Sequence, residues 1–424
     1  MSASAIADII LGIETNIALP IYAYWAHSNT MTGTPEKLPW YLGVFDAHCH
    51  PTDTLASLQT IPSMRAKVLT VMATRAEDQY LVADAAAIMG VRDADVYDED
   101  ERWSNEHKII PAFGWHPWFS HQIIDDHTTS KIVSLTQDEK IDHYQRVLNP
   151  SPEDREFMLS LPDPLPLSSF IEQTRRYLEQ YPLALIGEVG LDKSCRIPIP
   201  SSDEHHRDRA ADVTPGGREG RRLTPYRVNM SHQQLVLVAQ LRLAGEMQRA
   251  VSCHGVQAHG VLFDTLASTW KGYEQRKLSK KERKVQAARA ADCPDDEDAG
   301  TGGAKPYPPR LCLHSFSGTA ETVKQYLVPS IPCDIYFSFS TTINDWTDDG
   351  QGKVEMAVRA VPDDRILIES DMDRAGGDMD THLEQVIRKI CAVKQWDLEA
   401  GVKQLGNNWM RFVGLSTADR QAAS

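Results

Sequence analysis

The sequence predicts an α/β fold of the (β/α)8, or TIM barrel, class. Eight short apolar runs recur along the chain, as expected for parallel strands that are covered on both faces. Helical patterns lie between most of these runs, which is the alternation of a barrel inside a ring of helices. An open doubly wound sheet is the main alternative, but no GxGxxG turn follows the first run. The strands are expected at residues 40–48, 67–74, 108–115, 183–191, 249–255, 310–316, 333–340 and 365–370.

Helical patterns occupy most of the intervals between the expected strands. Residues 76–90 follow the second strand, and Gly90 is suited to the position that ends a helix. Ser231 is suited to the start of the segment before the fifth strand, because its hydroxyl can accept a hydrogen bond from a free backbone N–H. Further helices are expected at residues 167–181, 231–248, 319–327 and 381–393.

Composition and charge limit the class of protein. The chain has 424 residues, 42% of them hydrophobic, and its 44 basic and 59 acidic residues give a net charge of −15. An acidic surface argues against holding long duplex DNA on a broad basic face, although bound cations can still attract phosphate. Seven cysteines without a CxxC pair indicate buried thiols in a reducing compartment, so we expect an intracellular protein of the cytoplasm and/or nucleus.

We expect a single barrel domain at residues 41–415, between an N-terminal extension (1–40) and a tail (416–424). The apolar stretch of the extension is interrupted by Glu14 and Pro20 and lacks a preceding basic residue, so neither a secretory leader nor a membrane span is predicted. Four polar segments look inserted, and the last combines a basic helical stretch with an acidic, Gly/Pro-rich linker. The insertions are expected near residues 91–107, 120–165, 196–222 and 271–308.

Two histidines, His48 and His50, end the first apolar run in the stretch FDAHCHPTD. Side chains alternate along a strand, so both rings should share the inward face of a barrel with Val44 and Asp46. Pro51 cannot continue a parallel ladder, which places both rings at the carboxyl end of the strand, where barrel enzymes carry their catalytic residues. Two imidazoles on one face can bind one Zn or Mn ion, but an HxH pair alone is weak support for such a site.

Four more metal-capable side chains stand at the ends of later runs. Glu188 lies between apolar residues, where a carboxylate is costly unless it is paired or coordinated. One histidine in such a position is more often a hydrogen-bonded core residue, but six such groups at strand ends favour a site for two metal ions. The other three are His254 in SCHG, His314 in LHSFSG and Asp371 in ESDMD.

Six ordered motifs resemble those of the TatD-type metal-dependent deoxyribonucleases, which belong to the amidohydrolase-like (β/α)8 metal hydrolases. The likeness extends from residue 42 to about residue 413, where LGNNWMRFV resembles the closing helix of that family and contains Asn408. The long insertions look most like the fungal branch, whose members have been described as partners of a TPR subunit of the anaphase-promoting complex. The motifs are FDAHCHPTD, FGWHPW, IGEVGLD, SCHGV, LHSFSG and ILIESDMD.

The resemblance implies a role for each candidate residue and two divalent ions, of Mg, Mn or Zn. Asp192 would orient a ligand or cap a loop. The ligands implied for the first ion are His48, His50 and Asp371, and those for the second are His254 and His314. Glu188 would bridge the two ions. His116 would bind substrate near the scissile phosphate.

Three positions depart from the family pattern, and all of them lie on the substrate rim. Gln257 follows His254 without the usual nearby arginine, Asp373 replaces a common proline, and Lys193 replaces a common aromatic residue. These changes put the identity of the substrate in doubt more than the binding of metal.

The implied activity is hydrolysis of DNA phosphodiester bonds by a deoxyribonuclease, an exonuclease acting on DNA ends or single strands. Two cations about 4 Å apart would activate a water molecule, with Asp371 as general base and Glu188 holding both ions. One alternative is an amidohydrolase-type enzyme for a small amide, lactone or ester. Another is a binding protein whose barrel keeps the site while its insertions dock a TPR-containing partner.

Overall fold

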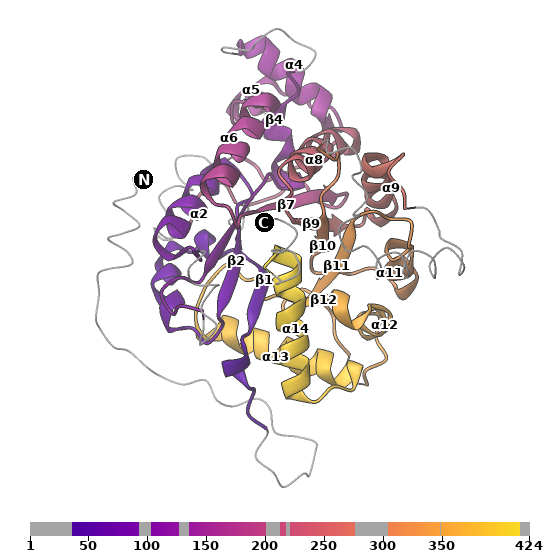
Figure 1. Cartoon of the computed structure of the whole chain (residues 1–424). Helices are drawn as coiled ribbons and strands as arrows, with labels where there is room; N and C mark the ends of the chain where they lie inside the picture. The colour runs from indigo at the N-terminus through magenta and orange to yellow at the C-terminus, as the bar shows by residue number, and fades with distance from the viewer. Residues whose placement is uncertain are drawn as a thin grey trace.

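Eight parallel strands form a nearly closed barrel with helices around it, so the predicted fold class is confirmed (Figure 1). The computed structural model describes residues 36–92, 103–126, 135–200, 213–217, 221–275, 304–347 and 349–415. Each strand pairs with the next one of the barrel in chain order. The strands are β1 (Phe45–Cys49), β2 (Val68–Met72), β3 (Ile109–Phe113), β7 (Leu185–Asp192), β9 (Val251–Val256), β10 (Arg310–Leu313), β11 (Asp334–Phe339) and β12 (Ile366–Ile368).

The first and last strands meet at a seam that closes the barrel. The carbonyl of His48 accepts a hydrogen bond from the Asp371 N–H at 3.0 Å, and the His50 N–H donates to the carbonyl of Met372 at 2.8 Å. Asp46 Oδ1 accepts a further bond from the Ser370 N–H at 3.0 Å. The seam therefore brings the first and last sequence motifs together at the same end of the barrel.

The start of β1 differs from the prediction. Residues Trp40–Leu42 form a 3-10 helix rather than the beginning of the strand, and Gly43 follows with φ of +94°. The pairing of β1 with β2 also shifts register between Asp46 and Cys49. This irregularity breaks the simple alternation that was expected to place Val44, Asp46, His48 and His50 on one face. Asp46 instead bonds the backbone of the seam.

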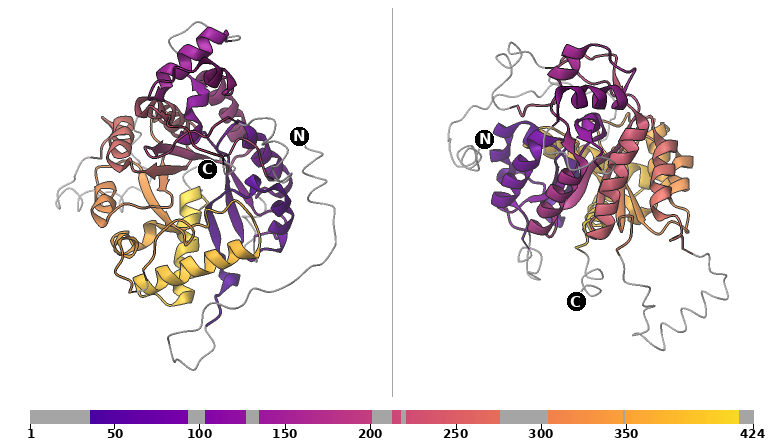
Figure 2. Two further views of the ribbon diagram at one scale, coloured as in Figure 1. Left: turned by 180° about the vertical axis from the view of Figure 1, so that it is seen from behind. Right: turned by 90° about the horizontal axis from the view of Figure 1, so that it is seen from above.

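Helices follow most strands and cover the outside of the barrel (Figure 2). The segment after β1 is 3-10 rather than α-helical, with Pro51 and Pro62 inside it. The α-helices outside the 120–165 insertion are α2 (Ala76–Met89), α6 (Leu167–Gln180), α8 (Met230–Glu246), α9 (His259–Trp270), α11 (Ala320–Tyr326), α12 (Lys353–Ala360), α13 (Gly377–Lys394) and α14 (Leu398–Val413).

Two predicted helix ends can be compared with the structure. Gly90 is the C-cap of α2, as expected, and a Cβ at this position would lie 2.2 Å from the Ala86 carbonyl oxygen, so only glycine fits without a shift. Ser231 is not the N-cap of α8, because the helix begins one residue earlier and its cap is Asn229. The Asn229 side chain donates to the Arg146 carbonyl at 2.5 Å instead of capping, so the usual capping signal was misleading here.

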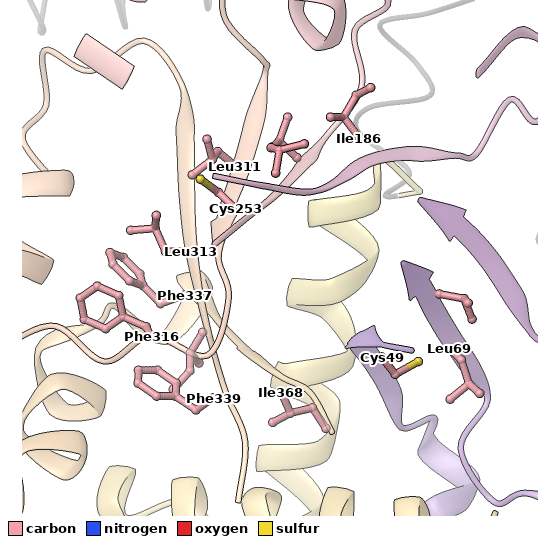
Figure 3. Close-up of a cluster of buried hydrophobic side chains, with 14 of the residues drawn as sticks. Cys49, Leu69, Ile186, Cys253, Leu311, Leu313, Phe316, Phe337, Phe339 and Ile368 are labelled. Carbon is pink, nitrogen blue, oxygen red and sulfur yellow. The ribbon is translucent and has the colours of Figure 1, made fainter. Parts of the chain in front are cut away.

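Apolar side chains from all eight barrel strands form the core, together with Phe316 from a rim loop, and some of them are drawn in Figure 3. Near the amino ends of the strands, α14 supplies aromatic residues: Trp409 stacks on Phe45 with ring centroids 4.4 Å apart and donates to Thr70 Oγ1 at 3.2 Å. Asn408 is fully buried and donates to the carbonyls of Asp363 and Ile366. The closing helix thus anchors β12, on which Asp371 depends for its position.

The segment expected as an insertion at residues 120–165 contains its own helices, α4 (Gln137–Val147) and α5 (Arg155–Ser160). Thr136 and Glu139 form a capping box at the start of α4. Short strand pairs flank the helices: β4 (Ile123–Ile124) with β6 (Leu165–Pro166), and β5 (Leu148–Asn149) with β8 (Arg227–Val228). Residues 1–35, 416–424 and most of the other three expected insertions lie outside the described residues, so the proposed domain boundaries stay a prediction.

Three buried histidines join this helical insertion to the barrel. His121 lies in the 3-10 helix η4 (Pro117–Gln122), His143 in α4 and His232 in α8. His143 Nε2 lies 2.8 Å from the His121 carbonyl oxygen, and His232 Nε2 lies 2.9 Å from that of Ser120. Burial, and next the neighbouring histidines, lower the pKa of His121 to about 3, and burial lowers that of His143 to about 4.

These histidines predict a loss of stability in mild acid. Their pKa values in the folded chain lie below the ordinary value of about 6.5, so the unfolded chain binds more protons once the pH falls below that value. Between pH 7.5 and 5.5 each of His121 and His143 should cost about 1.4 kcal/mol of unfolding free energy, measured by urea denaturation. The His143→Gln variant keeps a donor toward His121 but cannot titrate, so it should lose less stability over this range. An equal loss in the variant would contradict the assignment.

Candidate metal centre

All six predicted metal ligands meet at the carboxyl ends of the barrel strands. His48 belongs to β1, and His50 follows that strand directly. His254 lies within β9, while His314 and Asp371 follow β10 and β12. Glu188 lies within β7, which continues to Asp192 rather than ending soon after the carboxylate. The pairing of β7 with β9 shifts register between Ile186 and Val189, so the backbone is irregular at Glu188 as it is at His48.

Glu188 is the centre of the cluster, and its two oxygens face different groups. Oε1 lies 2.7 Å from His314 Nε2 and 2.9 Å from His254 Nδ1. Oε2 lies 3.5 Å from His50 Nε2 and 3.7 Å from His48 Nε2. The carboxylate is 5% exposed, so it is held almost entirely by these imidazoles. A carboxylate in this arrangement can share its two oxygens between two cations.

One side of Glu188 carries His48, His50 and Asp371. The two Nε2 atoms of the histidines are 3.1 Å apart, and Asp371 Oδ1 lies 3.4 Å from that of His50 and 3.8 Å from that of His48. The three donor atoms all lie within 4.8 Å of one another. Asp371 has a positive φ of 53°, a conformation that few non-glycine residues adopt and that the β1–β12 seam holds in place.

The other side of Glu188 carries His254 and His314, whose Nδ1 and Nε2 atoms are 3.2 Å apart. The ring of His314 also stacks on the ring of His48, with centroids 3.8 Å apart. The two sides are therefore adjacent parts of one cluster. Convergent imidazole and carboxylate donors of this kind fit divalent cations of the Mn or Zn type and, through the carboxylates, Mg.

Two of the ligand histidines have a protein oxygen within hydrogen-bond distance of the second ring nitrogen. Ser252 Oγ lies 2.7 Å from His48 Nδ1, and Asp192 Oδ2 lies 3.3 Å from His254 Nε2. For His314, the carboxylate of Glu369 lies 3.8 Å from Nδ1, which is an electrostatic contact rather than a hydrogen bond. Such partners fix the orientation of a ligand ring and raise its basicity. Asp192 therefore both orients His254 and, through Oδ1, accepts bonds from the Ser194 and Cys195 N–H groups.

Sequence reasoning missed Ser252 and Glu369. Each stands two residues before a predicted ligand, Ser252 before His254 within β9 and Glu369 before Asp371 in the segment directly after β12. On a strand, residues at that spacing share a face, so Ser252 lies one layer deeper in the barrel than His254. A polar residue two positions before a predicted ligand is the sequence pattern that could have identified Ser252 and Glu369.

His116 acts in this cluster as a hydrogen-bond donor. The backbone N–H of Trp118 donates to His116 Nδ1 at 3.0 Å, so in the neutral ring the proton must reside on Nε2. That Nε2 lies 3.2 Å from Glu188 Oε1 and is not free to bind a metal ion. Burial, only partly opposed by the charge of Glu188, lowers the pKa of His116 to about 4, so the ring is neutral near pH 7.

The cluster attracts positive charge. Burial alone would raise the pKa of Glu188, but the facing histidines, His116 and His314 first, hold it well below its usual value. Burial opposes protonation of His50, yet its bond to Asp371 and the two nearby carboxylates raise its pKa to about 9. Carboxylates surrounded by donors in this way suit divalent cations, which would replace the protons of the imidazoles.

A cavity of about 390 Å³ opens next to the cluster. Its lining includes His50, Glu188, His254 and Asp371, together with apolar side chains of the rim. The volume lies within the range of roughly 300–1,000 Å³ typical of small-molecule sites. Metal-capable groups and the cavity thus form a single candidate active site.

The comparisons with known proteins point to one family. A sequence model described as "TatD related DNase" matches residues 45–414. "Cut9-interacting protein scn1" of Schizosaccharomyces pombe is 35% identical over 378 residues, which cover 87% of this chain and 98% of that protein. "Uncharacterized deoxyribonuclease YMR262W" of Saccharomyces cerevisiae is 29% identical over 273 residues, or 64% and 68% of the two chains.

Solved structures with a similar fold were also found. A TatD family hydrolase of Entamoeba histolytica is 12% identical, covers 87% of this chain and 97% of its own, and has a TM-score of 0.47. The TatD homologue YJJV of Escherichia coli is 18% identical. The match covers 88% of this chain and 98% of that chain, with a TM-score of 0.45. Within the described part of the chain, every helix is too short or too polar to cross a lipid bilayer.

Because Asp192 Oδ2 lies beside His254 Nε2, we expect the Asp192 carboxylate to affect metal binding by His254. Asp192→Asn removes the carboxylate that orients the ring, so the affinity for one ion should fall about 10- to 100-fold. Titration calorimetry and metal analysis after limited chelation measure this change, with circular dichroism as the check on folding. Asp373→Asn removes the same charge from an exposed position after β12 and is the matched control. Equal affinities in both variants would contradict the orienting role of Asp192.

Proposed function

The chain belongs to the TatD related DNase family, and from this premise we propose that it is a metal-dependent deoxyribonuclease. The bond cleaved is a DNA phosphodiester, the substrate is a DNA end or single-stranded DNA, and the mode of action is that of an exonuclease. The observation that carries the proposal is the division of the Glu188 oxygens between two sets of donors. A carboxylate shared in this way can hold the pair of cations with which a two-metal hydrolase cleaves phosphate esters.

Two divalent ions, of Mg, Mn or Zn, are part of the proposal. His48, His50 and Asp371 would hold the first, His254 and His314 would hold the second, and Glu188 would contribute to both. When bound, such ions lower the pKa of a water molecule and neutralise charge on the phosphate oxygens. Among the described residues that line the cavity, Arg75 is the only lysine or arginine, so this neutralisation matters for an anionic substrate.

Asp371 is the general base in this mechanism. Its side chain is 13% exposed, more than that of Glu188, and it lines the cavity where water and substrate enter. Ser315 Oγ lies 3.0 Å from Asp371 Oδ2, which fixes the carboxylate and leaves Oδ1 turned toward His48 and His50. The carboxylate can take a proton from the attacking water while that water is held in line with phosphorus.

His116 binds the substrate phosphate. Its Nε2–H faces Glu188 Oε1 at 3.2 Å at the edge of the cavity, and it would turn to a phosphate oxygen once cations compensated the charge of Glu188. A neutral imidazole can donate to a phosphate oxygen without competing for a cation. The same proton can stabilise the leaving oxygen as the phosphorus–oxygen bond breaks.

A second function is favoured by the name of one relative. The protein scn1, 35% identical over nearly its whole length, is described as interacting with Cut9. We therefore also propose that this chain binds a TPR-containing partner, which does not exclude nuclease activity. The six cysteines of the described residues are buried free thiols, in keeping with a proposed place of action in the cytoplasm or nucleus.

The nuclease proposal predicts the loss of metal-dependent DNA cleavage in Glu188→Gln and in His254→Ala. The first change keeps the size of the side chain but removes the charge that holds both ions, so the rate should fall at least about 1,000-fold. Release of nucleotides from labelled single-stranded DNA with Mg²⁺ or Mn²⁺, and its arrest by EDTA, measures this effect. Met356→Ala, on the exposed face of α12, is the control. Wild-type turnover in a folded Glu188→Gln protein with its metal intact would end the assignment.

The partner proposal predicts that an insertion contributes to docking. The expected insertion at residues 271–308 lies mostly outside the described residues, but the rings of Tyr273 and Tyr307 at its ends are 5.6 Å apart. Residues 276–303 can therefore be replaced by a short Gly/Ser linker while Tyr307 stays in place. Pull-down of a TPR partner should weaken at least tenfold, with DNA cleavage retained. Undiminished capture would show that the insertion is not the docking element.

A further inference from the structure

We propose that Trp118 and Ile343 form the binding wall for one unpaired base of the DNA substrate. The inference rests on the proposed nuclease function and specifies how the site selects its substrate. Both side chains line the cavity beside the metal-capable cluster. They come from opposite parts of the rim, Trp118 from η4 after β3 and Ile343 from the loop after β11.

Ile343 is an exposed apolar residue in an unusual place. Its exposed fraction is 56%, although it stands at the mouth of a cavity that contains His50, Glu188 and Asp371. Large apolar side chains left open to water beside a binding site commonly contact a ligand. Its backbone N–H bonds Ser340 Oγ at 3.1 Å, so the loop holds the side chain at this rim.

Trp118 presents an aromatic ring next to the ligands of the second proposed ion. Its ring stands nearly perpendicular to that of His116, at 80°, with centroids 4.7 Å apart. Its Nε1–H donates to Asp192 Oδ2 at 2.6 Å, the same oxygen that lies 3.3 Å from His254 Nε2. The indole is therefore fixed in place, so it can offer its surface to a ligand at low entropic cost.

The charge of the lining explains why a base, rather than a second phosphate, suits this wall. Among the described residues that line the cavity, Arg75 is the only lysine or arginine. Its guanidinium is already bonded to Asp53 at 2.7 Å, to Asp78 at 3.0 Å and to the Pro215 carbonyl at 3.1 Å. Phosphate charge is thus met at the metal centre, while Trp118 and Ile343 offer apolar surface from opposite parts of the cavity rim.

The cavity volume of about 390 Å³ suits a nucleotide-sized group rather than a length of duplex. Stacking of a base on an aromatic side chain tolerates any base, because every base has a flat face. A paired base has no free face to offer without unstacking and unpairing, which costs energy. The wall therefore selects a base that is already unpaired, at a frayed end or in a single strand.

The test combines two changes in the protein with one change in the substrate. Trp118→Phe keeps an aromatic ring but removes the bond to Asp192, whereas Trp118→Leu removes both. The substrates are a short single-stranded oligonucleotide and the same molecule with an abasic residue at the reacting end. Met356→Ala is again the control, since that residue lies on α12 outside the cavity lining.

Loss of stacking should raise KM for the intact oligonucleotide about tenfold in Trp118→Leu and several-fold in Ile343→Ala, with a smaller effect in Trp118→Phe. On the abasic substrate, whose KM with the wild-type protein should already be raised, the same variants should have much less effect. Equal losses on both substrates, or equal losses in Trp118→Phe and Trp118→Leu, would overturn the inference, because Trp118 would then act only through Asp192.

A binding measurement separates this inference from the nuclease proposal. Fluorescence anisotropy with phosphorothioate-linked versions of the two oligonucleotides reports affinity without turnover. If the wild-type protein cleaves neither substrate, the nuclease proposal fails, but weaker binding of the intact oligonucleotide to Trp118→Leu still supports the base wall. Affinities that do not differ between the intact and abasic molecules reject the wall even if cleavage is normal.

Discussion

The buried carboxylate of Glu188 is the constraint on which the rest of the site depends. An ionised carboxylate that is 5% exposed in a barrel mouth would be very unfavourable without compensation. Three strands, β1, β9 and β10, with the residues directly after them, and one rim loop after β3 supply that compensation as imidazoles around its two oxygens. Divalent cations would compensate the charge more fully than protons, since each carries two charges to the same small volume. The same geometry that makes the carboxylate tolerable in the fold therefore makes it useful for hydrolysis.

The barrel seam is the second element of the site. Backbone bonds between His48 and Asp371, and between His50 and Met372, set the distance between the first and last ligands. The closing helix α14 supports this seam from the opposite end, where Asn408 anchors the start of β12 and Trp409 packs on Phe45. Residues far from the chemistry thus hold Asp371 in its positive-φ conformation beside the histidines. Ser252 and Asp192 complete the support by bonding the second ring nitrogens of His48 and His254.

Much of this architecture could be predicted from the sequence because its main signals are local. Apolar runs predicted all eight strands, and metal-capable residues at the ends of five of them predicted the convergence of six side chains. The predictions were wrong or incomplete where contacts between distant parts of the chain, rather than local sequence patterns, determine the structure. The register shifts at His48 and Glu188 depend on neighbouring strands, so alternation misplaced Asp46. The tautomer of His116 depends on a backbone N–H two residues away, and the helices of the 120–165 insertion depend on packing against η4 and α8.

The central claim is that Glu188 holds two divalent cations between its separate oxygens. Anomalous diffraction from crystals of the protein equilibrated with Mn²⁺ tests it most directly. The account predicts two peaks about 4 Å apart, one beside His48, His50 and Asp371 and the other beside His254 and His314, with Glu188 in contact with both. A single peak that does not touch Glu188, or no peak among these side chains at saturating Mn²⁺, would contradict it.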